Sequence, residues 1–286
     1  MKVKKVGVVG CGLMGSGIAE VCARSGYQTA VLEVNQQFLD KGMASIKSSL
    51  DKAVSKGKVS QQDRDATLGR LQGTIKMEDF GDCDLVIEAV IENMDEKKRV
   101  FAALDKVCPK HAILASNTSC LSILQMAMAT QRPSQVIGMH FFQPVPVMTM
   151  VEIVKTIVCS DETVSTAQSV SQSLGKKVIF AKDTPGFLVN RLGFPYMMNA
   201  IRILEEGWTT VEELDQAWML GTNSPMGPFA LMDFAGLDTM YSMACAMYDE
   251  FHDRLYAPPP LLKAMVTAGR MGRKSGRGFY DYTKKS

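Results

Sequence analysis

A glycine-rich turn, Gly10-Cys-Gly-Leu-Met-Gly15, constrains the fold of this chain more than any other segment. It follows a valine-rich run, Lys5 to Val9, and opens a helix-like segment from Ser16 to Ser25. The next apolar run, Gln28 to Leu32, ends at Glu33, eighteen positions beyond Gly15. A GxGxxG sequence alone is a weak signal, but a strand before it, a helix after it and an acidic residue at the end of the next strand are typical of a dinucleotide-binding unit.

The glycines of this turn have separate expected roles. Gly10 permits the tight turn, Gly12 lets the backbone approach a pyrophosphate, and Gly15 brings the helix against the strand. The amino terminus of the helix attracts phosphate. We therefore count Leu13 and Met14, which lie between these glycines, among the cofactor-binding residues.

Glu33 predicts which dinucleotide binds. Its carboxylate would accept hydrogen bonds from the adenosine ribose hydroxyls and repel a 2′-phosphate. The residues that follow it, Val34, Asn35 and Gln36, supply no arginine to replace it. The sequence therefore predicts NAD(H) rather than NADP(H).

A histidine and a carboxylate follow in a second informative stretch. His140 closes the apolar run Val136 to Met139, and the two prolines between Gln143 and Val147 indicate a chain reversal. Thr149 to Lys155 then alternates apolar and polar residues like a strand. If that strand folds back beside His140, Glu152 reaches the imidazole, fixes its tautomer and leaves the other ring nitrogen as a base.

Alternating strand and helix patterns continue to about Phe180 and predict a doubly wound α/β sheet, a Rossmann-like fold. The segment from Asp183 to Arg191 contains proline and glycine and marks a boundary. We expect a dinucleotide-binding domain over residues 1–184 and an all-helical domain over residues 185–286. The helices expected in the second domain are Asn190 to Glu206, Val211 to Leu220, Pro228 to Phe251 and Pro260 to Ala268, with a capping box at Thr210 and Glu213.

The overall composition limits the possible partners. Thirty-two basic and thirty acidic residues leave a net charge of +2, which supports neither a nucleic acid nor an anionic membrane as main partner. No stretch approaches a membrane-spanning length. Seven scattered cysteines without a CxxC pair suggest neither disulfides nor a metal site, so we expect no metal, reduced thiols and a cytoplasmic location.

Some residues allow two interpretations. A helical pattern from Phe38 to about Lys56 is followed by a charged stretch that looks mobile up to Arg70. Lys52, Lys56 and Lys58 are more often a solvated face than phosphate ligands of coenzyme A. Glu92 and Lys97 lie either near the nicotinamide side of the cofactor or on a helix surface. Many methionines of the second domain are expected to fill its core or a two-fold dimer contact, and the glycine-rich tail from Gly272 is expected to be a surface loop.

Several segments together resemble one known family, and they occur in order along essentially the whole chain: GCGLMG, SNTS, HFFQPVPV, the Val-Glu-Ile around Glu152, DTPGFLVNR and GRKSGRGFYDY. The set is similar to the L-3-hydroxyacyl-CoA dehydrogenases, and most similar to their short bacterial members, the 3-hydroxybutyryl-CoA dehydrogenases. The resemblance implies a homodimer formed through the helical domain and NAD as cofactor. It also implies interconversion of an (S)-3-hydroxyacyl-CoA and a 3-oxoacyl-CoA, here 3-hydroxybutyryl-CoA and acetoacetyl-CoA.

The resemblance also implies site residues. His140 matches the catalytic general acid/base and Glu152 its carboxylate partner, while Ser119 and Asn190 match residues that bind the reacting oxygen and the substrate. Ser49 and Lys56 match contacts to coenzyme A. The positions that match cofactor contacts are Glu33, Glu92, Lys97, Asn117 and Ser119.

The chain departs from the family pattern at Gln143, where the family usually has Asn; the longer side chain displaces the amide of this cofactor-side residue. Two rival functions remain open: a dehydrogenase of free hydroxy acids or sugar acids on the same scaffold, and a nucleotide sensor without catalysis. Without a fused hydratase domain, the chain is expected to act alone. The sequence determines neither the acyl-chain length nor the physiological direction.

Overall fold

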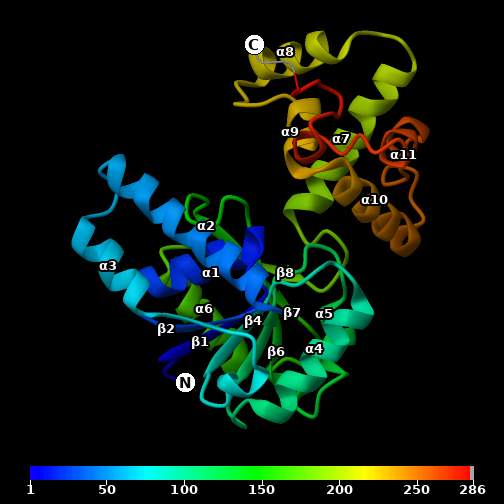
Figure 1. Cartoon of the computed structure of the whole chain (residues 1–286). Coiled ribbons are helices and arrows are strands. Elements are labelled where there is room, and N and C mark those ends of the chain that lie inside the picture. Colours follow the sequence, from blue (N-terminus) through cyan, green and yellow to red (C-terminus); the bar gives the residue numbers. More distant parts are fainter. Residues whose placement is uncertain (284–286) are drawn as a thin grey trace. The chain divides into compact units, whose positions relative to one another are not determined.

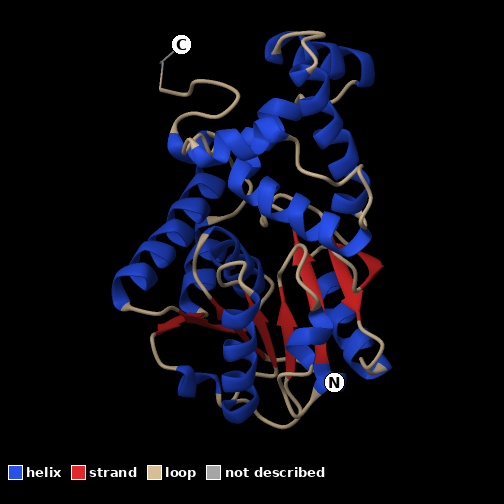
Figure 2. Cartoon of the chain, turned by 90° about the vertical axis from the view of Figure 1, so that its right-hand side faces the viewer, coloured by secondary structure: helices blue, strands red, loops and turns tan. Residues whose placement is uncertain are grey.

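The computed structural model describes residues 1–283 and divides the chain into two compact units, Met1–Thr184 and Pro185–Ser286 (Figure 1). The first unit combines one sheet with flanking helices, and the second is built almost entirely of helices (Figure 2). The predicted fold class is confirmed. None of the described helices is long and apolar enough to cross a membrane.

The first unit contains an eight-stranded sheet in the order β3-β2-β1-β4-β5-β6-β7-β8. All neighbouring strands run parallel except β6 and β7, which are antiparallel. The strands are β1 (Lys5–Val9), β2 (Gln28–Leu32), β3 (Leu71–Thr74), β4 (Leu85–Glu88), β5 (Ile113–Ser116), β6 (Val136–Phe141), β7 (Met150–Lys155) and β8 (Lys177–Lys182).

Helices cover both faces of this sheet (Figure 1). One face is covered by α1 (Leu13–Arg24), α2 (Gln36–Ser55) and α6 (Asp161–Ser173), and the other by α4 (Met94–Val107) and α5 (Ile123–Ala127). A helix α3 (Gln61–Gly69) and two short 3₁₀ turns, Met77–Phe80 and Pro133–Gln135, complete the unit.

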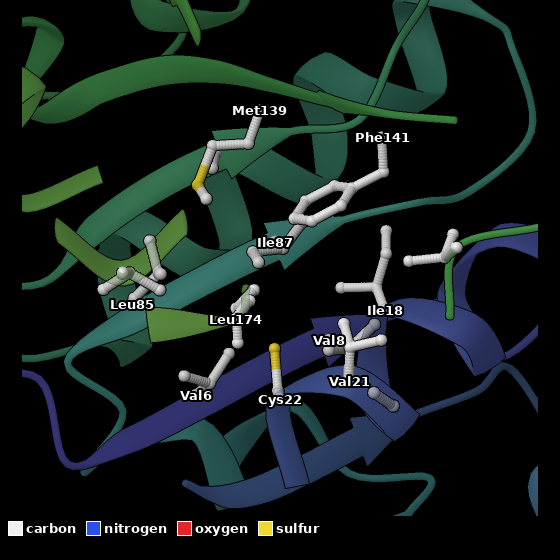
Figure 3. Close-up of a cluster of buried hydrophobic side chains, with 14 of the residues drawn as sticks. Val6, Val8, Ile18, Val21, Cys22, Leu85, Ile87, Met139, Phe141 and Leu174 are labelled. Carbon is white, nitrogen blue, oxygen red and sulfur yellow. The ribbon is translucent and has the colours of Figure 1, made fainter. Parts of the chain in front are cut away.

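The core under α1 is built from side chains of several neighbouring strands. Alternate residues of β1, β4 and β6 point to the same face, and α1 packs over them (Figure 3). The labelled side chains are Val6, Val8, Ile18, Val21, Cys22, Leu85, Ile87, Met139, Phe141 and Leu174. Because the strands are buried on both faces, their sequences read as continuous apolar runs.

The strand order reverses between β1 and β4, since β2 and β3 lie on one side of β1 and β4 to β6 on the other. Ligands of open α/β sheets bind outside the carboxyl ends of the strands at such a switch point. The glycine-rich turn follows β1 at this point, and the segments after β4, β5 and β6 lie along the same sheet edge.

The second unit contains α7 (Val189–Glu205), α8 (Val211–Thr222), α9 (Pro228–Ala235), α10 (Leu237–Phe251) and α11 (Pro260–Thr267), with a 3₁₀ turn at Arg273–Ser275. The capping box at Thr210 and Glu213 is confirmed. The single helix expected from Pro228 to Phe251 is wrong: it breaks at Gly236, whose φ of +97° is left-handed.

Three further expectations need correction. The stretch expected to be mobile up to Arg70 contains helix α3, and strand β3 directly after it was not predicted. The glycine-rich tail is more than a surface loop, because buried Asp233 accepts hydrogen bonds from the N–H groups of Phe279 and Tyr280. Tyr280 in turn donates its hydroxyl to buried Asp215, so two aspartates hold the tail against the helices.

A buried ion pair joins α4 to the segment before β6. Arg132 Nε donates to Asp105 Oδ1 at 2.7 Å, and the N–H of Gln131 donates to Asp105 Oδ2 at 2.8 Å. Burial opposes ionisation of Asp105, but these donors outweigh it and hold its pKa below the ordinary 3.8.

Replacing Asp105 with Asn is expected to lower the free energy of unfolding by about 3 kcal/mol near neutral pH, because Arg132 loses its buried counter-charge. The folded-state pKa of Asp105 is depressed, so this stability is fully present above about pH 4 and is lost as the pH falls further. Urea unfolding of both proteins is measured from about pH 7 to about pH 3. The difference between their free energies of unfolding should stay constant down to about pH 4 and then shrink. Asp249→Asn, at an exposed position, is the control and should cost under about 0.5 kcal/mol; a similar loss there would contradict this account.

Candidate active site

The glycine-rich turn has the geometry that a bound pyrophosphate requires. A Cβ at Gly15 would lie 1.8 Å from the carbonyl oxygen of Gly10, and one at Gly10, whose φ is +92°, would lie 2.6 Å from that of Ala89. Around Gly12, in contrast, a Cβ would meet nothing within 4 Å. Helix α1 begins at Leu13 without a side-chain cap, so its first-turn N–H groups are presented at the turn.

Glu33 lies directly beside this turn. Its Oε1 accepts the N–H of Cys11 at 2.6 Å and its Oε2 accepts the N–H of Val34 at 3.1 Å. The carboxylate is therefore held at the end of β2, where the adenosine ribose of a dinucleotide lies in this fold.

A cavity of about 580 Å³ opens at the same place, between the carboxyl ends of β2, β1 and β4. It is lined by Val9, Gly10, Gly12, Leu32, Glu33, Val34, Phe38, Ile75, Met77, Ala89, Val90, Ile91, Glu96 and Val100. Its mostly apolar wall and the Glu33 carboxylate fit an adenosine and its ribose. The sequence patterns do not identify Phe38 and Ile75, which are about half exposed here. The signal that could have found them is a large apolar residue a few positions after the end of a strand.

His140 and Glu152 form the pair that the sequence predicts. They lie opposite each other in the β6–β7 ladder, and His140 Nδ1 is 2.7 Å from Glu152 Oε2. Glu152 is completely buried and His140 nearly so. The ring of Phe142 lies 4.5 Å from the imidazole, centroid to centroid. Because Nδ1 faces Glu152, Nε2 is the ring nitrogen that can exchange a proton with a substrate.

Glu92 and Lys97 organise the loop after β5. Lys97 is 1% exposed, so the interpretation as a helix surface charge is wrong for this residue. Its Nζ lies 2.6 Å from Glu88 Oε1 and 3.3 Å from Glu92 Oε2. Glu92 Oε1 accepts the Thr118 hydroxyl and the N–H of Ser119. Burial opposes ionisation of Glu92, but the Lys97 charge and these donors hold its pKa below the usual range.

The remaining predicted residues occupy several parts of the chain. Asn117 Oδ1 accepts the N–H of Phe141 at 2.9 Å and thereby ties the end of β5 to the residue after His140. Gln143 is half-buried in the turn that follows β6, and Asn190 lies in the second unit, at the start of α7.

Ser49 and Lys56, the predicted coenzyme A contacts, are seven residues apart and lie along one side of α2. Ser49 is half-buried beside buried Glu20, while Lys56 is exposed at the C-terminal cap. Lys56 is the more accessible of the two for an anionic ligand.

Lys176 was not singled out in the sequence, yet it supports the turn that carries Gln143. Its Nζ donates to the carbonyl oxygens of Val145 and Met148, both at 2.6 Å. Burial lowers the pKa of this lysine. Nothing in its local sequence distinguishes it from a surface lysine, because its partners lie about thirty residues earlier.

A nucleotide cavity and a buried histidine–carboxylate pair at one edge of a doubly wound sheet are characteristic of dinucleotide-dependent dehydrogenases. Two family models match the chain: the 3-hydroxyacyl-CoA dehydrogenase NAD-binding domain over residues 5–184 and the C-terminal domain of the same family over residues 186–282. The chain belongs to the 3-hydroxyacyl-CoA dehydrogenase family and is an NAD-dependent oxidoreductase, as its sequence motifs predict.

Individual members of this family are similar to the chain over almost its full length. A 3-hydroxybutyryl-CoA dehydrogenase of Mycobacterium tuberculosis is 48% identical over 98% of this chain and 99% of its own. The human mitochondrial hydroxyacyl-coenzyme A dehydrogenase is 40% identical over 98% of this chain and 91% of its own. The crystal structure of (S)-3-hydroxybutyryl-CoA dehydrogenase PaaH1 from Ralstonia eutropha is 42% identical, superposes with a TM-score of 0.94 and covers 99% of this chain and 100% of its own.

Proposed function

We propose that this chain interconverts (S)-3-hydroxybutyryl-CoA and acetoacetyl-CoA with NAD(H). The observation that carries the proposal is the 2.7 Å contact between His140 and Glu152, which lies along the same sheet edge as the cofactor cavity. The substrates named for the relatives support the choice of a short 3-hydroxyacyl-CoA.

In the oxidation direction, His140 Nε2 takes the proton of the hydroxyl on carbon 3 as that carbon loses its hydride. NAD, when bound, supplies the acceptor for this hydride. The carbon–hydrogen bond breaks, the carbon–oxygen double bond forms, and the proton remains on an imidazolium that Glu152 stabilises. In the reduction direction the same imidazolium returns the proton to the oxygen.

Ser119 and Asn190 are proposed to donate hydrogen bonds to the oxygen on carbon 3, where negative charge develops. Glu92 holds the backbone of Ser119 through its N–H at 3.1 Å, which fixes the position of this hydroxyl donor. Asn117 and Gln143 are proposed to face the nicotinamide, together with Glu92 and Lys97.

Glu33 is proposed to select NAD(H). Replacing Glu33 with Gln removes the charge that repels a 2′-phosphate, so the preference for NADH over NADPH, as a ratio of kcat/KM values, should fall by about tenfold. Glu96→Gln, which changes another carboxylate lining the cavity, is the matched control and should leave the ratio nearly unchanged. An unchanged ratio in Glu33→Gln would contradict the assignment.

Ser49 and Lys56 are proposed to bind the coenzyme A part of the substrate, with Lys56 pairing a phosphate. The exposed position of Lys56 at the end of α2 supports this contact. The first unit would then hold both the cofactor and the CoA handle.

We further propose a cytoplasmic homodimer formed through the second unit. Large apolar side chains are exposed there, with Leu192 83%, Trp208 78% and Leu220 78% accessible. Apolar surface of this kind is typical of protein–protein contacts. The seven cysteines, all of them free, suit a reducing compartment.

The function is tested by NADH oxidation with acetoacetyl-CoA and, in parallel, with free acetoacetate. Turnover with the CoA ester at a kcat/KM at least about a hundredfold higher than with the free acid is expected, because the CoA handle contributes binding energy. Comparable turnover of the free acid would move the assignment to a hydroxy-acid or sugar-acid dehydrogenase.

A further inference from the structure

Glu88, the last residue of β4, has no part in the function described so far. It is completely buried. Its Oε1 accepts from Lys97 Nζ at 2.6 Å and from the N–H of Val90 at 2.7 Å, and its Oε2 accepts the Ser116 hydroxyl at 2.6 Å. Together the two oxygens accept hydrogen bonds from three donors, and neither oxygen donates one, which is the pattern of an ionised carboxylate.

The charges around Lys97 do not balance. Its single ammonium is shared by two carboxylates, Glu88 at 2.6 Å and Glu92 at 3.3 Å. The cluster of these three residues therefore carries one surplus negative charge. Part of it remains accessible from solvent, because the Glu92 side chain is 37% exposed while the other two are buried.

The cluster lies on the nicotinamide side of the switch point. Adenosine is expected near Glu33 at β2, so the other end of an extended dinucleotide reaches the segments after β4 and β5. Glu92 follows β4 and holds Ser119, which follows β5, through the N–H of Ser119. The surplus charge is thus placed where the ring that changes charge would bind.

We propose that Glu88 is a positioning residue that biases the site toward oxidised NAD. It anchors Lys97, and so leaves Glu92 only partly neutralised beside the nicotinamide. The oxidised ring is cationic and the reduced ring is neutral, so one negative charge stabilises the oxidised form selectively. This inference rests on the proposed function, because it assumes that NAD binds with its nicotinamide on this side.

The size of the effect follows from Coulomb's law. At a separation of roughly 10 Å and an effective dielectric constant of about 20 to 40, one charge changes the relative affinity for the two forms by about fivefold to twentyfold. A tenfold change corresponds to about 30 mV in the two-electron potential of the bound cofactor.

The test compares dissociation constants of NAD⁺ and NADH, measured by calorimetry, for the unaltered protein, Glu88→Gln and Ser116→Ala. Glu88→Gln keeps the shape and removes the charge, so the ratio Kd(NAD⁺)/Kd(NADH) should rise by about tenfold. Ser116→Ala removes a hydrogen bond to the same carboxylate without changing charge, and its ratio should stay within about twofold. A purely structural role of Glu88 would instead weaken both forms equally in both variants.

A second variant, Glu92→Gln, keeps the test decisive if Glu88→Gln does not fold. Glu92→Gln makes the same change of charge at a more exposed carboxylate, and its ratio must rise as well. An unchanged ratio in whichever charge variant folds, or an equal rise in Ser116→Ala, would overturn the inference. If the unaltered protein binds neither NAD⁺ nor NADH, the proposed function is overturned and this inference with it.

Discussion

Replacing His140 with Gln should lower kcat for acetoacetyl-CoA reduction by about two to four decades, the usual contribution of a general acid/base. The affinity for NADH should change little, because no part of the cofactor cavity is formed by His140. Steady-state kinetics gives the first quantity and fluorescence titration of NADH gives the second.

The chain offers a matched control at the opposite edge of the sheet. His111 also pairs with a carboxylate, with its Nε2 2.9 Å from Asp84 Oδ1, but Asp84 precedes β4 and the histidine side chain is 54% exposed. His111→Gln should retain nearly full turnover. A His140→Gln protein that keeps most of its turnover, or an equal loss in His111→Gln, would contradict the assigned role.

Replacing Glu152 with Gln should also lower kcat, by about two to four decades. The side chain keeps its shape, but an amide can present an N–H to His140 Nδ1 and so stabilise the tautomer that carries its proton on Nε2. That tautomer cannot take a proton from the substrate at Nε2, and the imidazolium loses its buried counter-charge.

The measurements that separate this effect from unfolding are the melting temperature and the NADH dissociation constant of Glu152→Gln. Both are expected to show a folded protein that binds its cofactor, with the loss confined to kcat. A kcat within about threefold of the unaltered enzyme would show that the carboxylate does not orient the histidine.

The sequence predicts the site well where its signals are local. The glycine-rich turn, its flanking strands and Glu33 are contained within thirty residues, and the structure forms this unit with β2 at the predicted bounds. The return of β7 along β6 is also predicted, because prolines mark the reversal and alternation marks the strand. Residues 142–149 connect these two strands, and their ladder places His140 opposite Glu152.

The sequence fails where a partner is distant or a pattern is too short. Lys97 looks like any lysine of an amphipathic helix, and only the position of Glu88 at the end of β4 explains its burial. Strand β3 contains Gln72 and Gly73 within four residues, so it lacks the apolar run of the other strands.

Two predictions for the second unit, the single helix through Gly236 and the surface-loop tail, are wrong for similar reasons. Helical periodicity continues through Gly236, and only the left-handed φ of that residue ends α9. The tail is held by Asp215 and Asp233, which lie 65 and 47 residues before Tyr280, so no local pattern distinguishes it from a surface loop.

The most direct test of the central claim follows one hydrogen atom. (S)-3-Hydroxybutyryl-CoA carrying deuterium on carbon 3 is turned over with NAD, and the mass of the NADH formed is measured by mass spectrometry. If His140 removes the hydroxyl proton while carbon 3 gives up its hydride, the NADH formed carries one deuterium and the solvent none. Unlabelled NADH, or no turnover of this thioester, would contradict the proposed reaction.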